Sequence, residues 1–330
     1  MKRTLGLTLL LFATLFSCMR QEKPLPAELS RAESVMWEHP DSALSILRSM
    51  PQSSLSSGKN YATWALLLAQ ARDKVYGKRL PDSLNIPSSD KLVQDAMDYF
   101  EKEGNLKRMA QTYYYKGQLL KDQKKITEAM PFFLKSKEMM TKLDEPLFTY
   151  LICQSLGNTY RYQDLYEESL VQLKDAYQYA LRSGNGERIS YALSELGRTY
   201  VHKNEMDSAL FYFGKSLDNA QRLGNIELEA MAMGELGVVY NKLSQGEKAL
   251  HYTRKELDLC LQISSLHKLP QVYYKIGSAF WSLGQLDSAK VYFQKSLETD
   301  NLYTLNEAYE VLYYICVEQK LYKEAIAVSY

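Results

Sequence analysis

The chain has 330 residues, of which 46% are hydrophobic and 24% are charged, a composition that excludes intrinsic disorder and supplies enough apolar material for a large folded body. Its 40 Lys and Arg residues balance 39 Asp and Glu residues, and this near-neutral charge argues against a nucleic-acid-binding protein, which needs a basic excess. Length alone predicts about two domains, unless the chain is a repeat array that grows along one axis without a single central core.

The first segment has the features of an export signal. A basic start precedes an apolar run from Leu5 to Phe16, which is shorter than the ~20 residues that a membrane-spanning helix needs. The run ends in "LFSC", which resembles the lipobox of bacterial lipoproteins, where cleavage leaves a lipidated cysteine as the first residue. We therefore expect a lipoprotein signal peptide over residues 1–17, a lipid on Cys18 and a tether over residues 18–26. The alternative is an ordinary secretory signal with an incidental cysteine.

Residues 27–105 have an irregular helical pattern. The expected helices cover residues 27–37, 40–50, 61–77 and 90–105, with a long loop over residues 77–89. The motif "DSAL" at residues 41–44 returns at residues 207–210. We interpret this part as two degenerate helical repeats, the second of which carries the loop as an insertion.

Beyond residue 105 the chain repeats itself every forty residues. Five glycines keep this spacing, namely Gly117, Gly157, Gly197, Gly237 and Gly277. A large residue stands three positions after most of them, a small residue twelve positions after, and a bulky residue sixteen positions after. Apolar residues at three- and four-residue spacing predict two amphipathic helices per unit, and the glycine lets them approach closely while the bulky residue fills the space beside it. Such a hairpin cannot bury its own apolar faces, so it must stack on a copy of itself.

The turns between units carry their own signal. Gly104-Asn105, Gly184-Asn185 and Gly224-Asn225 occupy equivalent positions. A glycine just past a helix end adopts the left-handed conformation that closes the last turn. These dipeptides therefore predict helix ends at residues 103, 183 and 223.

This pattern resembles the tetratricopeptide repeat, in which Leu-Gly, Tyr, Ala and Phe stand at these offsets, as in "LGNTY", "LGRTY" and "LGVVY". The resemblance implies an all-α, right-handed α-solenoid, here with longer helices than in the usual unit of ~34 residues. It covers residues 106–330 as about five regular units and a partial sixth. The arrangement is similar to Bacteroidetes lipoproteins and sensor regions that contain these repeats. Solenoids usually end in a polar capping helix, and because none is written at "LYKEAIAVSY", we expect either a further helix or another surface to cover that end.

The sequence contains no arrangement of residues that indicates catalysis. The four histidines show no metal-binding spacing, and no phosphate-binding loop or nucleophile motif is present. We expect no enzyme activity, cofactor or metal site. Three cysteines, Cys153, Cys260 and Cys316, are flanked by apolar residues and are expected to be buried free thiols.

The resemblance also implies a binding groove, because the first helix of each such repeat lines the concave side of the solenoid. The lining positions lie six and three residues before the glycine, and one, four and five after it. The residues expected to bind a partner are Tyr114, Gln118, Lys121, Gln154, Asn158, Arg161, Tyr191, Arg198, His202, Asn241, Lys242, Tyr274 and Trp281. Arg161, Arg198 and Lys242 predict positive charge at the centre of the groove, suited to a peptide with an acidic feature. The alternative is that these residues only form solvated helix faces.

These features favour a non-catalytic scaffold that binds a protein or peptide in the groove and is held in the cell envelope by its lipid. One alternative is a sensor domain, a truncated relative of membrane-attached transcriptional regulators that contain these repeats. Another is an enzyme or a glycan-handling protein, which would require activity or sugar binding by the purified chain.

Overall fold

The computed structural model describes residues 25–76, 89–299 and 301–318. The predicted signal peptide, Cys18, most of the tether and nearly all of the predicted loop over residues 77–89 lie outside the described residues. Within the described ranges the chain forms fifteen α-helices and two short 3-10 helices, without a strand. The prediction of an all-α helical solenoid is confirmed.

The chain divides into two compact units, with the boundary between Asp122 and Gln123 in the sequence. This division falls inside the first predicted regular repeat, whereas the sequence placed the boundary between residues 105 and 106. The helices of unit 1 are α2 (Ala27–Val35), α3 (Pro40–Ser49), η1 (Gln52–Leu55), α4 (Gly58–Tyr76), α5 (Ser89–Glu103) and α6 (Leu106–Asp122). Successive helices of this unit pack on one another, so the degenerate segment forms helical hairpins.

Unit 2 contains the regular repeats. Its helices are α7 (Ile126–Lys142), α8 (Pro146–Arg161), α9 (Tyr166–Ser183), α10 (Gly186–His202), α11 (Met206–Leu223), α12 (Ile226–Lys242), α13 (Gly246–Gln262), η2 (Leu266–Lys268), α14 (Leu269–Ser282), α15 (Leu286–Ser296) and α16 (Leu302–Glu318). The second helix of the predicted sixth unit lies outside the described residues.

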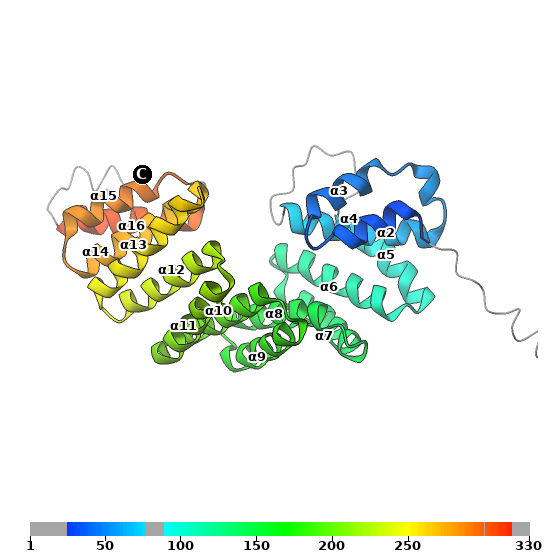
Figure 1. Cartoon of the computed structure of the whole chain (residues 1–330), viewed down its shortest axis with the longest axis horizontal. Helices are drawn as coiled ribbons and strands as arrows, with labels where there is room; N and C mark the ends of the chain where they lie inside the picture. The colour runs from blue at the N-terminus through cyan, green and yellow to red at the C-terminus, as the bar shows by residue number, and fades with distance from the viewer. Residues whose placement is uncertain (1–24, 77–88, 300, 319–330) are drawn as a thin grey trace, which may run out of the picture. The chain divides into compact units, whose positions relative to one another are not determined.

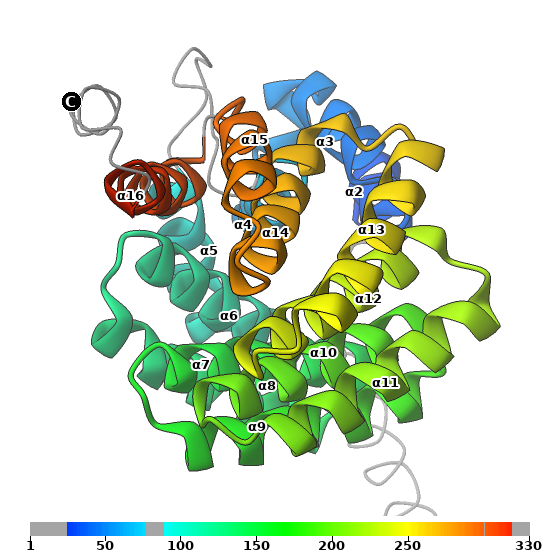
Figure 2. The same cartoon turned by 90° about the vertical axis from the view of Figure 1, so that its left-hand side faces the viewer.

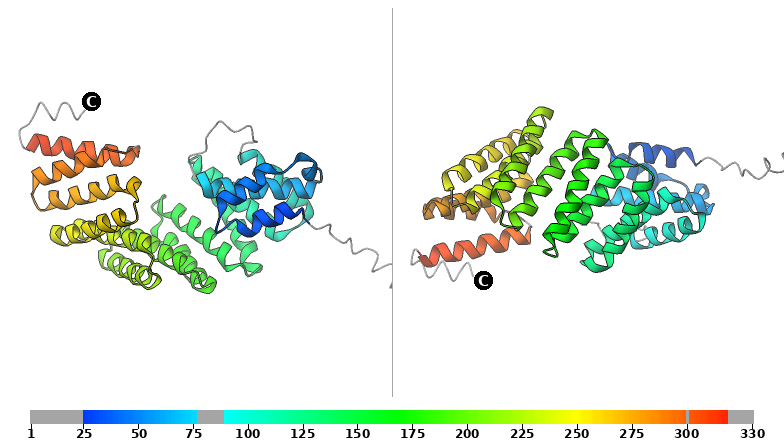
Figure 3. Two further views of the ribbon diagram at one scale, coloured as in Figure 1. Left: turned by 45° about the horizontal axis from the view of Figure 1, so that its top comes forward. Right: turned by 90° about the horizontal axis from the view of Figure 1, so that it is seen from below.

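The helices of unit 2 form two layers. Each first helix pairs with the helix that follows it, as in the green hairpins α8–α9 and α10–α11 of Figure 1. The first helices α8, α10, α12 and α14 also contact one another in sequence and form one layer. In Figure 2 the yellow and orange helices form two further hairpins, α12–α13 and α14–α15. In Figure 3 the helices α14, α15 and α16 lie side by side. We call the solvent-facing side of α8, α10, α12 and α14 the first-helix face.

The repeated glycines lie where the two helices of a hairpin cross. A Cβ atom added at Gly157 would lie 2.5 Å from Leu173, and one added at Gly197 would lie 2.6 Å from the ring of Phe213. The corresponding distance from Gly237 to Thr253 is 2.5 Å, and the Cβ of Gly277 would lie 3.1 Å from Phe293. In each pair the neighbour is the residue sixteen positions later. The predicted role of the glycine and of the residue that fills the space beside it is confirmed at these four crossings.

The turns have a shorter period than the sequence pattern indicated. A residue with a left-handed backbone stands every twenty residues from Gly104 to Gly284, at the end of first and second helices alike. Glycine occupies four of these positions, and the other six are Lys124, Asp144, Asp164, Asn204, Ser244 and Ser264. In the turns that begin with Gly184 and Gly224, the next residue, Asn185 or Asn225, accepts a hydrogen bond from a backbone N–H of the following helix. The glycine thus closes one helix and the asparagine caps the next.

The six non-glycine turn residues provide a graded test of this geometry. Ser244 has a φ of 56° and an exposed side chain, so Ser244→Gly removes a steric cost without removing a buried contact. After allowance for the larger entropy of glycine in the unfolded chain, we expect a gain of ~0.5–1 kcal/mol in the free energy of unfolding, measured by urea titration. Asn204→Gly should give a smaller gain, because asparagine tolerates this conformation. A loss of stability in Ser244→Gly would contradict the assigned turn.

Candidate functional site

A pocket of about 400 Å³ opens on the first-helix face of unit 2. It is bounded by α10, α12, η2 and α14, and by α13 below them. Its lining residues are Tyr191, Arg198, Glu227, Leu228, Ala230, Met231, Glu235, Glu256, Cys260, Lys268, Gln271 and Lys275. The lining therefore combines three cations, three carboxylates and a strip of apolar side chains.

A buried ion pair forms one wall of this pocket. Lys275 Nζ on α14 donates to Glu256 Oε1 on α13 over 2.7 Å, and the Glu256 side chain is only 7% exposed. Burial raises the pKa of Glu256 although Lys275 opposes the shift, whereas the attraction of Glu256 and Glu235 outweighs burial and raises the pKa of Lys275. Gly234 makes room for the pair, since a Cβ atom there would lie 2.4 Å from both Glu256 Oε1 and Lys275 Nζ.

A chain of ion pairs crosses three first helices. Arg161 on α8 lies 2.8 Å from Glu195 on α10, and both side chains are 10% exposed. Glu195 also accepts from Arg198, three residues later on the same helix, over 2.7 Å. Arg198 Nε donates to Glu235 on α12 over 2.7 Å. Burial lowers the pKa of Arg198, but the attraction of Glu235 and Glu195 outweighs it, so the net shift is upward.

These pairs correct the predicted charge of the groove. Arg161 and Arg198 do not present free positive charge, because Glu195 and Glu235 neutralise them. The prediction of unbalanced positive charge is therefore wrong for these two residues, while Lys242 is exposed at the end of α12. The sequence does contain a sign of these pairs that the analysis of the repeat did not use. Charged residues occupy the position two before a repeated glycine in three units, namely Glu195, Glu235 and Lys275.

The predicted binding residues of unit 2 share one layer but not one pocket. Tyr191 and Arg198 line the pocket, as do Met231 and Gln271 from the same lining positions. The others lie on the same first helices outside the pocket and are Gln154, Asn158, Arg161, His202, Asn241, Lys242, Tyr274 and Trp281. No described residue hydrogen-bonds the buried Oδ1 atoms of Asn158 and Asn241.

Two further groups of predicted residues have local partners. His202 stacks on Tyr166 with 6.2 Å between ring centroids, and burial, together with Arg161 and Lys242, lowers its pKa. Tyr114, Gln118 and Lys121 lie on α6 in unit 1. There Gln118 donates to the Tyr114 hydroxyl over 2.7 Å, and Lys121 donates to Gln118.

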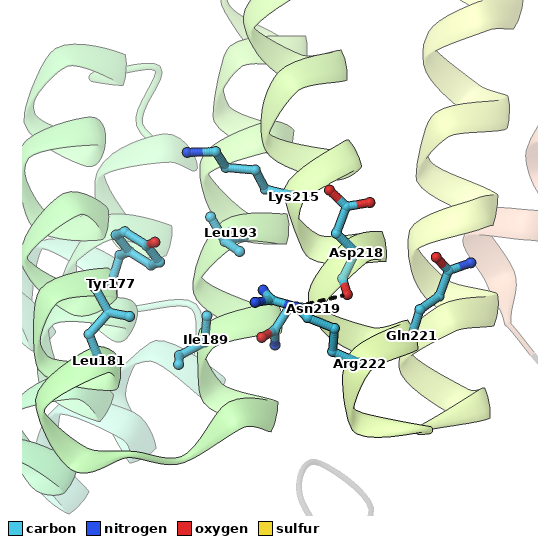
Figure 4. Close-up of a pocket in the computed structure, with 9 residues that line it drawn as sticks. All are labelled: Tyr177, Leu181, Ile189, Leu193, Lys215, Asp218, Asn219, Gln221 and Arg222. Carbon is cyan, nitrogen blue, oxygen red and sulfur yellow. Dashed lines mark hydrogen bonds between the residues drawn. The ribbon is translucent and has the colours of Figure 1, made fainter.

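A second hollow of about 900 Å³ lies between α9, α10 and α11. Figure 4 shows its lining, in which Tyr177 and Leu181 come from α9 and Asn219 and Arg222 from α11. Asn219 is its buried polar side chain, and it already donates to the Gly186 carbonyl and to Ser190. Because the smaller pocket has a buried oxygen atom without such a partner, we take the smaller pocket as the candidate site.

The remaining expectations concern thiols, metals and membranes. Cys153, Cys260 and Cys316 are buried and free, as predicted. No cluster of His, Cys, Asp and Glu side chains within the described ranges could hold a metal ion. None of the described helices is long and apolar enough to span a bilayer.

Comparison with known proteins agrees with the repeat geometry. The tetratricopeptide repeat model matches residues 110–139 and 270–301, which belong to the first and last of the five regular units. No curated protein matches the chain.

Three solved structures with similar folds share 14–15% of residues with the chain. The apo form of RapI superposes with a TM-score of 0.71 over 91% of this chain and 84% of its own, at 14% identity. A signal transduction ATPase with a tetratricopeptide repeat sensor from Pyrococcus horikoshii gives 0.68 over 88% of this chain at 15% identity, and the match spans 43% of the ATPase chain. NprR in complex with its cognate peptide NprX gives 0.65 over 93% and 88% of the two chains at 14% identity. The chain thus contains two segments that match the tetratricopeptide repeat, and its fold is similar to that of tetratricopeptide repeat solenoids.

Proposed function

We propose that the chain is a scaffold that binds an extended peptide segment of a partner on the first-helix face of unit 2. The main support for the proposal is the pocket on that face. Its lining contains both apolar side chains and buried charged groups, and the ring of Tyr191 beside it is 40% exposed. The carboxamides of Asn158 and Asn241 lie on the same first helices, where asparagine side chains can hydrogen-bond a peptide backbone if they turn outward. The peptide complex of the similar protein NprR supports this choice of ligand.

The proposed role is non-catalytic. The charged residues of the pocket are held in ion pairs, and the one thiol in its lining, Cys260, is a poor nucleophile because burial raises its pKa. The lining thus offers recognition chemistry: acceptors, donors and an apolar surface. Because Arg161 and Arg198 are neutralised, the charge balance of the face does not favour an acidic partner over others.

Selection of random peptides displayed on phage tests the proposal. We expect the purified chain to enrich a peptide family, and Tyr191→Ala to weaken the selected peptides by about tenfold, because exposed tyrosines beside pockets are frequent hot spots. Phe211→Ala is the matched control, since Phe211 is 54% exposed on the second helix α11. Enrichment of no peptide, or equal loss in both variants, would contradict binding at the first-helix face.

A sensor role is the second candidate, favoured by the likeness to the ATPase that carries a tetratricopeptide repeat sensor. In this role the same face would bind the signal, and a further module would respond to it. A transmembrane or DNA-binding segment encoded after Tyr330 would favour the sensor over the scaffold.

We also propose that the protein is exported and held in the cell envelope by a lipid on Cys18. The basic start, the apolar run and the "LFSC" motif support this location. In Cys18→Ala the anchor cannot form, so we expect the protein to leave the membrane fraction, as measured by fractionation and immunoblotting. Cys153→Ala controls for the loss of a thiol, and unchanged membrane partitioning of Cys18→Ala would contradict the lipid anchor.

A further inference from the structure

One buried carboxylate oxygen in the pocket has no partner. Glu256 lies on α13, beneath the layer formed by the first helices, and the whole residue is 6% exposed. Lys275 donates to its Oε1 atom, but no described residue hydrogen-bonds its Oε2 atom, which is buried. A buried acceptor without a donor costs about 1–3 kcal/mol, and more when the group is charged. The pocket therefore contains a specific site for a hydrogen-bond donor.

The pocket wall beside Glu256 carries no side chain at Gly234, although the Oε2 atom itself is buried in the unbound protein. Gly234 stands three residues before its repeated glycine, where the other units have Tyr114, Gln154, Ser194 and Tyr274. A Cβ atom at this position would lie 2.4 Å from both Glu256 Oε1 and Lys275 Nζ, so a larger residue would displace the ends of these two side chains. Leu228, Ala230, Met231 and Cys260 line the same pocket. A long aliphatic stem with a cationic tip fits this combination of apolar wall and acidic floor.

We propose that this pocket takes a lysine or arginine side chain of the bound peptide, with its cationic tip donating to Glu256 Oε2 once the carboxylate, which is buried in the unbound protein, turns toward the pocket. The inference rests on the proposed peptide-binding function and names the residue type that the pocket selects. Such a charge-assisted contact is stronger than one between neutral groups.

The other charges of the lining agree with a basic side chain. Arg198 is paired with Glu235, and Lys268 Nζ lies 2.5 Å from Glu227. Each cation of the lining therefore already has a carboxylate partner, whereas Glu256 has an acceptor to spare. An acidic ligand would have to displace a carboxylate from one of these pairs.

Pools of random peptides with one fixed central residue test the proposal. The fixed residues are lysine, arginine, norleucine and glutamate, and the dissociation constant of each pool is measured by fluorescence anisotropy. For the wild-type chain we expect the lysine and arginine pools to bind about thirtyfold more tightly than the norleucine pool, because the contact lies in a desolvated site. In Glu256→Gln the difference should fall to about twofold.

Two further variants make the result specific. Glu227→Gln removes an exposed carboxylate of the same lining and should leave the preference for basic residues unchanged. Lys275→Met removes the cation that opposes the raised pKa of Glu256, so the preference for basic residues should depend more steeply on pH than in the wild-type chain. Circular dichroism at 222 nm checks the fold of each variant, and the wild-type comparison of lysine with norleucine needs no variant.

The outcomes separate this inference from the function on which it rests. Tight binding of all pools without preference for lysine or arginine, or a preference that survives in a folded Glu256→Gln, would overturn the inference alone. Failure of every pool to bind the wild-type chain would overturn peptide binding itself, and the inference with it.

Discussion

Gly197→Ala is expected to destabilise unit 2 by about 3 kcal/mol, because the added methyl group has no space between α10 and α11. The new Cβ atom would lie 2.6–2.8 Å from three ring carbons of Phe213, a fully buried residue. The ring is held between two helices, so relief requires the hairpin to open. A urea titration followed by circular dichroism at 222 nm would measure the loss.

Gly214→Ala is the matched control for this substitution. Gly214 lies in the middle of the same hairpin's second helix, and no atom stands within 4 Å of its added Cβ. Because alanine is the better helix former, this variant should gain ~0.5–1 kcal/mol. If Gly197→Ala lowers the free energy of unfolding and Gly214→Ala raises it, the close helix crossing at Gly197 is confirmed. A similar small change in both variants would contradict it.

Glu195→Gln is expected to cost about 3 kcal/mol in the free energy of unfolding, although the side chain keeps its shape. Glu195 accepts from both Arg161 and Arg198, and its side chain is 10% exposed. The neutral amide leaves the buried guanidinium of Arg161 and the partly exposed one of Arg198 with one carboxylate fewer between them. Thermal and urea unfolding of the variant would measure this cost.

Glu138→Gln shows what an exposed pair contributes. Glu138 pairs with Lys142 on the surface of α7, where both side chains are about two-thirds exposed, so we expect no measurable change in the unfolding midpoint. Equal effects of the Glu138 and Glu195 substitutions would mean that the ion-pair chain across α8, α10 and α12 does not stabilise the unit.

The repeat fold could be predicted because its determinants are local and periodic. Gly157, Gly197 and Gly237 mark the helix crossings directly, since close packing excludes a Cβ atom there. The sequence predicted only those turns of the twenty-residue period that contain glycine. Lys124 and Ser244 adopt the same left-handed conformation as Gly184, but side chains of their kind usually avoid it, so the sequence gives no sign of it.

The site was harder to predict, because it depends on contacts between helices of different units. The sequence pattern gave Tyr191 and Arg198 as lining residues, and both line the pocket. It did not give Glu195 or Glu235, whose pairing with arginines depends on side-chain directions across neighbouring helices. Glu256 was also missed, because it belongs to a second helix and lines the pocket only where Gly234 carries no side chain.

Site-specific photo-crosslinking in the native cell tests partner binding at the first-helix face most directly. A benzoylphenylalanine replaces either Tyr191, beside the pocket, or Phe211, a similarly exposed aromatic residue on α11. We expect irradiation to give a discrete adduct with a protein or peptide from position 191 and none from position 211. Adducts from position 211 alone, or identical adducts from both positions, would contradict the account.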